Sequence, residues 1–227
     1  MDALNLKIKI SWPVTALYFF LLAGGLWHIL DMFQGVMQTA APLIMAFLSV
    51  WIFISALFSI EEIRKKRRFI WWSAGIIILS LLVEIAGVQT GVIFGNYDYG
   101  KALKPFVGGA PLVIGFAWFN MVMGSLALIN NFASDKLKKS AVLTALAAAF
   151  LMVVFDMIME PAAVKLDYWS WENGIIPLQN YMAWFVCGFA FLYAGVRFKI
   201  VNGKIPKIAY HVYFAQLAYF LIIIIGK

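Results

Sequence analysis

The chain has 227 residues, of which 64% are hydrophobic and 13% charged, and its mean hydropathy is +0.89. A soluble domain carries about 25% charged residues, so this composition excludes a soluble nucleotide-binding sheet, a coiled coil and a disordered chain. It predicts an all-α, polytopic membrane protein that forms a single domain over residues 1–227. The one cysteine, Cys187, excludes an internal disulfide. His28 and His211 lie too far apart in the chain for a typical zinc site, so no metal is expected.

Seven apolar runs are long enough to cross a hydrocarbon core about 30 Å thick, which takes about 20 helical residues. Continuous hydrophobicity over such lengths indicates helices, because the strands of a membrane barrel alternate in polarity over about ten residues. In chain order, we expect membrane helices over residues 13–32, 41–60, 69–90, 111–130, 140–160, 180–197 and 207–226.

The basic residues are distributed unevenly between the two sides of this bundle. Fourteen of the 18 lysines and arginines fall on the side of the N-terminus, including the run Arg-Lys-Lys-Arg-Arg at 64–68. Only Lys101, Lys104, Lys165 and Lys227 fall on the other side. The positive-inside rule then predicts a cell-membrane protein with its N-terminus inside and its C-terminus outside. The net charge of +7 is explained by anionic lipid of the inner leaflet, so no nucleic-acid partner is expected.

Two long outer loops, 91–110 and 161–179, are rich in glycine, proline, tyrosine and tryptophan. Loops of this length are usually functional or disordered, and their aromatic, weakly charged composition argues against disorder. Their aromatic side chains either anchor the protein at the lipid headgroups or cover a pocket, and the two roles are compatible.

The two loops also resemble each other. Glu84 precedes Tyr97 by 13 residues, and Asp156 precedes Tyr168 by 12. This spacing suggests a duplicated helical hairpin over residues 69–130 and 140–197, although chance or shared interfacial needs explain the similarity equally well.

Three acidic residues, Glu84, Asp156 and Glu160, fall within or at the end of membrane helices. A carboxylate in hydrocarbon costs several kcal/mol, so such residues are functional candidates. Glu84 and Asp156 lie roughly 22 and 24 Å above the inner ends of their helices, which places them at one level near the outer surface. Asn180 is expected at the same level, and Asn120 either lines the floor of the pocket or packs helices together. The alternative for the carboxyls is that they only join helices by hydrogen bonds.

Carboxyls beside aromatic rings suit one kind of chemistry. The sequence has no phosphate-binding glycine loop, metal cluster or nucleophile–base pair, and no lysine inside the last helix for a retinal Schiff base. A buried carboxyl can hold a proton at neutral pH, and aromatic faces stabilise a developing cation. The pattern therefore favours protonation of an isolated alkene that arrives from the membrane.

Two blocks of sequence between residues 84 and 184 resemble the carotenoid hydratase family of bacterioruberin and monocyclic carotenoid synthesis. The first block holds Glu84, Gly87, Thr90, Gly91, Phe94, Gly95, Tyr97, Tyr99, Gly109, Pro111 and Trp118. The second holds Asp156, Pro161, Trp169, Trp171, Gly174, Pro177, Asn180 and Trp184. The flanking helices match only in hydropathy. Glu160 departs from the family pattern, in which an aspartate is expected before the proline.

The resemblance implies a cofactor-independent hydro-lyase that adds water to the terminal ψ-end double bond of an acyclic or monocyclic carotenoid. Membrane lipid and the carotenoid are the implied partners, with other enzymes of the pathway as further candidates. We expect Asp156 to act as the acid and Glu84 to orient the water, although the sequence alone allows the reverse. Glu160 and Asn180 would assist them. The residues expected to surround the substrate are Tyr97, Tyr99, Trp118, Asn120, Trp169, Trp171 and Trp184.

Two other functions fit parts of the pattern. A carotenoid cyclase begins with the same protonation but traps the cation with an internal double bond, and it needs a drier pocket than Asn120 and Asn180 would provide. A proton-coupled transporter could use the acids and the repeat for alternating access. Against a transporter, the acids gather near one surface and do not trace a path across the membrane.

Overall fold

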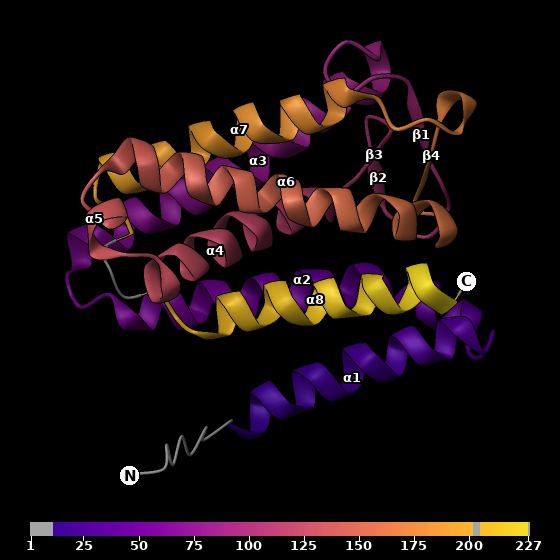
Figure 1. Cartoon of the computed structure of the whole chain (residues 1–227), viewed down its shortest axis with the longest axis horizontal. Helices are drawn as coiled ribbons and strands as arrows, with labels where there is room; N and C mark the ends of the chain where they lie inside the picture. Colours follow the sequence, from indigo (N-terminus) through magenta and orange to yellow (C-terminus); the bar gives the residue numbers. More distant parts are fainter. Residues whose placement is uncertain (1–10, 202–204, 227) are drawn as a thin grey trace, which may run out of the picture.

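The computed structural model describes residues 11–201 and 205–226 and contains a helix in each of the seven predicted runs (Figure 1). Its long helices are α1 (Trp12–Ile29), α2 (Gln34–Ser59), α3 (Ile63–Thr90), α4 (Ile114–Phe132), α6 (Ala141–Lys165), α7 (Leu178–Arg197) and α8 (Ile208–Gly226). The all-α membrane bundle is therefore confirmed. Four lysines counted in the topology prediction, Lys7, Lys9, Lys204 and Lys227, lie outside the described residues.

Among the described residues, five helices are long and apolar enough to cross a membrane: α1, α2, α3, α6 and α8. The other two long helices, α4 and α7, are not among these five. The centre of the bundle is α4, which is buried along most of its length and packs against α3, α6, α8 and α2. A helix shielded on all sides by protein can keep amide side chains at membrane depth, because neighbouring helices satisfy their hydrogen bonds.

Some helix ends differ from the predicted ones. The predicted end at residue 160 is wrong, because α6 continues through Pro161 to Lys165. Proline lacks the backbone N–H and removes one hydrogen bond of the helical ladder, yet the helix extends one turn past it. Glu160 consequently lies inside a helix and not at its end. Pro111 belongs to a short strand, and α4 begins three residues later at Ile114.

The two outer loops pair with each other across the end of the bundle. Strand β1 (Tyr97–Tyr99) runs antiparallel to β4 (Trp169–Trp171), with Tyr97 opposite Trp171 and Tyr99 opposite Trp169. Because alternate residues of a strand face opposite sides, these four aromatic side chains share one face. They are buried or half-buried, whereas the intervening Asp98 and Ser170 are exposed.

Three smaller elements complete this end of the molecule. Strand β2 (Phe106–Val107) pairs with β3 (Ala110–Pro111) ahead of α4, and the 3₁₀ turn η1 (Glu172–Gly174) leads from β4 toward α7. In Figure 1 all the strands lie at the end of the bundle where the C-terminus lies. This arrangement places the paired loops over the ends of α3 and α6.

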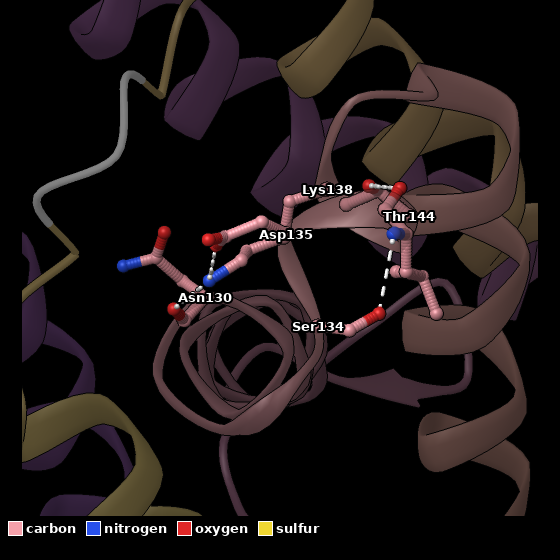
Figure 2. A network of polar contacts seen from close by, with 6 residues as sticks. Asn130, Ser134, Asp135, Lys138 and Thr144 are labelled. Atoms are coloured by element: carbon pink, nitrogen blue, oxygen red, sulfur yellow. Dashed lines mark hydrogen bonds and ion pairs between the residues drawn. The ribbon is translucent and has the colours of Figure 1, made fainter.

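The opposite end of the bundle holds the short helix α5 (Asp135–Lys138), which turns the chain from α4 into α6 (Figure 2). The Lys138 ammonium lies 3.0 Å from an Asp135 carboxylate oxygen and donates to the Asn130 carbonyl. The Thr144 hydroxyl donates to the Leu137 carbonyl at 3.3 Å. These contacts fix a tight corner at the end opposite the paired loops.

Topology can be tested with reporter fusions on either side of α6. The uneven distribution of basic residues predicts that a reporter placed after Lys139 reports the cytoplasm and one placed after Lys165 reports the outside. The structure places these two residues at opposite ends of α6. A pair of fusions reporting the same side would contradict both the span of α6 and the proposed orientation.

Close packing of α3 on α4 depends on Gly115. A Cβ atom at this position would lie 2.4 Å from the backbone oxygen of Ile77, which cannot move out of the way alone. We therefore expect Gly115→Ala to destabilise the folded protein by about 1–3 kcal/mol. The matched control is Gly75→Ala in α3, where a Cβ meets nothing within 4 Å, so the higher helix propensity of alanine leaves stability equal or higher. Melting temperatures in detergent measure both, and equal melting of the two variants would contradict the packing argument.

Candidate active site

Glu84 is held by three hydrogen-bond donors from three parts of the chain. The hydroxyls of Tyr97 and Tyr99 each donate to Oε2 at 2.8 Å, and the Trp118 indole N–H donates to Oε1 at 2.9 Å. Glu84 lies on α3, the tyrosines on β1 and Trp118 on α4. A carboxylate has about four lone-pair positions, so three are filled and one is left for a further donor.

The two tyrosines remain donors over the physiological pH range. Burial raises the pKa of Tyr97 and Tyr99 far above the usual value, and the nearby Glu84 carboxylate raises the pKa of both further. Both phenols therefore keep their protons, and their O–H groups stabilise negative charge on Glu84.

Glu160 has a matching set of donors on the other half of the site. The indole N–H groups of Trp169 and Trp171 donate to Oε2 at 2.8 and 2.7 Å, and the Asn180 amide donates to Oε1 at 3.2 Å. The Glu160 side chain is only 2% exposed. The paired strands thus supply two hydroxyls to Glu84 and two indole N–H groups to Glu160. By these contacts, Glu160 and not Asp156 is the counterpart of Glu84.

Asp156 differs from the other two carboxyls. It is 0% exposed, and its Oδ2 accepts a hydrogen bond from the Asn180 amide at 2.8 Å. Its Oδ1 is buried with no hydrogen-bond partner among the residues that the structure describes. Because the Asn180 amide nitrogen donates to both Asp156 and Glu160, it joins the two carboxyls of α6.

A cavity of about 40 Å³ lies between Glu84, Asn180 and the paired loops. It has room for a few water molecules, since a single water needs about 10–15 Å³ measured in this way. Glu84 and Asn180 are its charged and amide groups, and aromatic side chains form most of the remaining wall. One wall is a stacked pair in which the rings of Trp118 and Trp184 lie 4.1 Å apart and nearly parallel.

The structure brings together most of the side chains predicted for the site. Eight of the eleven line the cavity: Glu84, Tyr97, Tyr99, Trp118, Trp169, Trp171, Asn180 and Trp184. Asp156 and Glu160 lie immediately behind Asn180 and hydrogen-bond to it. No group of histidine, cysteine and acidic side chains suited to a metal ion occurs within the described residues.

The structure does not bring Asn120 to the cavity. Its amide donates to the Met45 carbonyl at 3.3 Å and accepts a hydrogen bond from the Ser49 hydroxyl at 2.8 Å. Asn120 therefore joins α4 to α2 as a packing amide, the second of its two expected roles. Asn120 therefore adds no polar group to the cavity and does not favour hydration over cyclisation.

Part of the cavity wall was not predicted from the sequence. Met45 of α2 and Phe220 of α8 line it, as do Phe94 and Tyr168 from the outer loops. Phe94 belongs to the first sequence block, and Tyr168 directly precedes Trp169 of the second. The sequence pattern could therefore have identified these two residues as part of the site. Met45 and Phe220 lie in predominantly apolar helices, where the sequence does not distinguish a cavity wall from lipid contact.

Residues 39–226 match the family described as "Carotenoid biosynthesis protein". The chain belongs to this family. The match covers most of α2 and every later element, and so includes every residue of the site. The sequence is also similar to the bisanhydrobacterioruberin hydratase of Haloarcula japonica, with 28% identity over 130 residues. That alignment covers 52% of this chain and 44% of the hydratase, less than half of its length. No solved structure matches the chain.

Membership of the carotenoid biosynthesis family confirms the resemblance drawn from the two sequence blocks. The family and the long apolar helices together establish an integral membrane protein of carotenoid biosynthesis.

Proposed function

We propose that this protein is a carotenoid hydratase that adds water to the terminal ψ-end double bond of an acyclic or monocyclic carotenoid without a cofactor. The observation that carries the proposal is a cavity with room for water, bordered by Glu84 and Asn180 and walled by aromatic rings. The similarity to a protein named a hydratase supports the same reaction. Following the basic residues, we place the site toward the outer leaflet of the cell membrane.

The proposed reaction has two bond-forming steps. The carboxyl proton of Asp156 is transferred to the less substituted alkene carbon, so the π bond breaks and a tertiary carbocation forms on its neighbour. A water molecule held by Glu84 and Asn180 then adds through its oxygen, and Glu84 takes the released proton. The sum is the addition of one water, and a proton must return from Glu84 to Asp156 before the next cycle.

The hydrogen bonds favour Asp156 as the group that carries the proton. Glu84 and Glu160 each accept three hydrogen bonds, and such donors stabilise the ionised form. Asp156 accepts one, and its other oxygen is buried without a described partner. A negative charge there would be largely uncompensated in a low-dielectric surrounding, which costs several kcal/mol.

Substrate binding must enlarge the cavity. A volume of about 40 Å³ holds water but not the branched end of an isoprenoid. Asp156 does not line the cavity but accepts a hydrogen bond from Asn180, which does. We propose that the entering chain displaces this side of the wall and exposes the Asp156 proton. The faces of Trp118 and Trp184 would then shield the carbocation by cation–π attraction.

Hydration is favoured over cyclisation by the polar groups at the cavity. Glu84 has one lone-pair position left for a donor. Asn180 uses its amide nitrogen on two carboxyls, which leaves its carbonyl oxygen to accept from water. A cyclase would have to keep water away from these groups while the cation exists.

Isotope labelling tests the water-addition step directly. Purified protein given lycopene in ¹⁸O-enriched water should form a product that carries one ¹⁸O for each new hydroxyl. Heat-denatured protein is the control for spontaneous hydration. A converted product without ¹⁸O and with the mass of lycopene would instead establish cyclisation.

A further inference from the structure

A second cavity, of about 60 Å³, lies beside the Glu84 cavity between α1, α2 and α8. Met45, Tyr168 and Phe220 line both cavities. These side chains therefore form the partition between the two spaces. Methionine is unbranched and adaptable, so Met45 can change rotamer and join them.

The second cavity faces the lipid between α1 and α2. Its lining includes Phe20 of α1 and Ile44 of α2, which are 64% and 40% exposed. The first helix packs chiefly along α8 and touches α2 at few positions. An apolar molecule dissolved in the bilayer can reach this cavity without passing through water.

One polar atom in this space has no described partner. The amide oxygen of Gln216, on α8, is buried and accepts no hydrogen bond from the described residues. Burying an amide oxygen in an apolar surrounding without a hydrogen bond costs roughly 1–3 kcal/mol in proteins. Such a group is explained when a bound molecule supplies the donor.

We propose that this second cavity is the subsite for the isoprenoid chain of the substrate. The reacting end would lie at Glu84, the chain would pass between Met45 and Phe220, and its continuation would leave toward lipid between α1 and α2. The Gln216 oxygen would accept a hydrogen bond from the new hydroxyl as the product departs. This inference rests on the proposed function, because it assigns a place to the part of the carotenoid that does not react.

Two substitutions close the proposed subsite from different helices. At Gly24 of α1, an added Cβ would meet the flexible tip of Met37 at 3.2 Å, so Gly24→Leu fills the cavity with little backbone strain. Ala41→Phe fills the same cavity from α2. The matched control is Gly75→Leu, which adds the same side chain to α3 where a Cβ meets nothing within 4 Å.

The three variants and the wild type are expressed in a lycopene-accumulating bacterium, and correctly folded protein is quantified by size-exclusion chromatography of fluorescent fusions. Two quantities are measured per amount of folded protein: hydrated carotenoid in the cells and pigment that co-purifies with the protein. Both Gly24→Leu and Ala41→Phe should lower each quantity by roughly ten-fold or more, as expected when a pocket loses room for a few carbon atoms. Gly75→Leu should match the wild type.

Pigment retention separates failure of this inference from failure of the proposed function. If folded Gly24→Leu and Ala41→Phe retain and hydrate as much carotenoid as Gly75→Leu, the subsite is wrong and the hydratase proposal stands. If the wild type retains pigment without hydrating it and both filled variants lose that pigment, the subsite is supported and the reaction is wrong.

Discussion

Replacing Glu84 by glutamine is expected to lower the yield of hydrated carotenoid by roughly 10²–10⁴-fold, the usual effect of losing a general base. Glutamine keeps the shape of the side chain but cannot take the proton released by the attacking water. The glutamine amide also has an NH₂ group where the carboxylate has its second oxygen. Either the tyrosine hydroxyls or the Trp118 indole N–H would then face a donor in place of an acceptor. Yield is measured by mass spectrometry of extracted pigments, per amount of inserted protein.

A matched control separates this effect from a general loss of charge. Glu62 directly precedes α3, at the opposite end of that helix from Glu84, and pairs with Lys65 at the surface. Glu62→Gln should leave the yield unchanged, because exposed ion pairs contribute little. A Glu84→Gln protein that inserts normally and hydrates at the wild-type rate would exclude Glu84 from proton transfer.

Asp156→Asn is expected to cause an equally large loss of activity, with little change in stability. Its carbonyl oxygen can still accept from Asn180, and its N–H group would occupy the place of the oxygen that has no described partner. The substitution thus removes the transferable proton while preserving the local packing. Hydrated product should fall by roughly 10²–10⁴-fold, and the melting temperature in detergent should stay close to that of the wild type.

Glu160→Gln is expected to lower stability, in contrast to Asp156→Asn. A residue at the membrane edge would tolerate this change, but Glu160 is buried and accepts from Trp169, Trp171 and Asn180. A glutamine amide must turn its N–H group toward one of these donors, which costs about 1–3 kcal/mol. The melting temperature should therefore fall for Glu160→Gln and not for Asp156→Asn; the reverse order would contradict the assigned protonation states.

The sequence was sufficient to predict the bundle and the general position of the site. Long apolar runs predict membrane helices reliably, because a segment that crosses hydrocarbon must satisfy its backbone hydrogen bonds internally. Acidic residues inside membrane helices predict the site for a related reason, since a charged side chain such as Glu84 is tolerated at that depth only where protein partners surround it. The level of these acids followed from counting residues along each helix.

The pairing of the two outer loops could not be predicted. The register that sets Tyr97 against Trp171 joins segments far apart in the chain, and no periodic pattern in three-residue strands specifies it. Without that register, the hydrogen bonds from the Trp169 and Trp171 indoles to Glu160 could not be predicted. Proline after Glu160 also predicted a helix end, because proline usually interrupts the backbone ladder.

Asn120 shows a different limit of the sequence. An amide inside a membrane helix either lines a polar pocket or joins two helices, and both roles require the same residue type. The choice depends on which way the side chain points around α4, and the Asn120 amide donates to the Met45 carbonyl of α2. Only the packing of the helices decides between the two.

The most direct test of the central claim is the mass of the pigments made by a lycopene-accumulating bacterium that expresses the wild type, Asp156→Asn or Glu84→Gln. The wild type should convert lycopene to a product heavier by the mass of one water for each reacted end, and both variants should leave lycopene unconverted at equal amounts of inserted protein. Near-wild-type yield from both variants, or a wild-type product with unchanged mass and an altered absorption spectrum, would contradict carboxyl-catalysed hydration at this site.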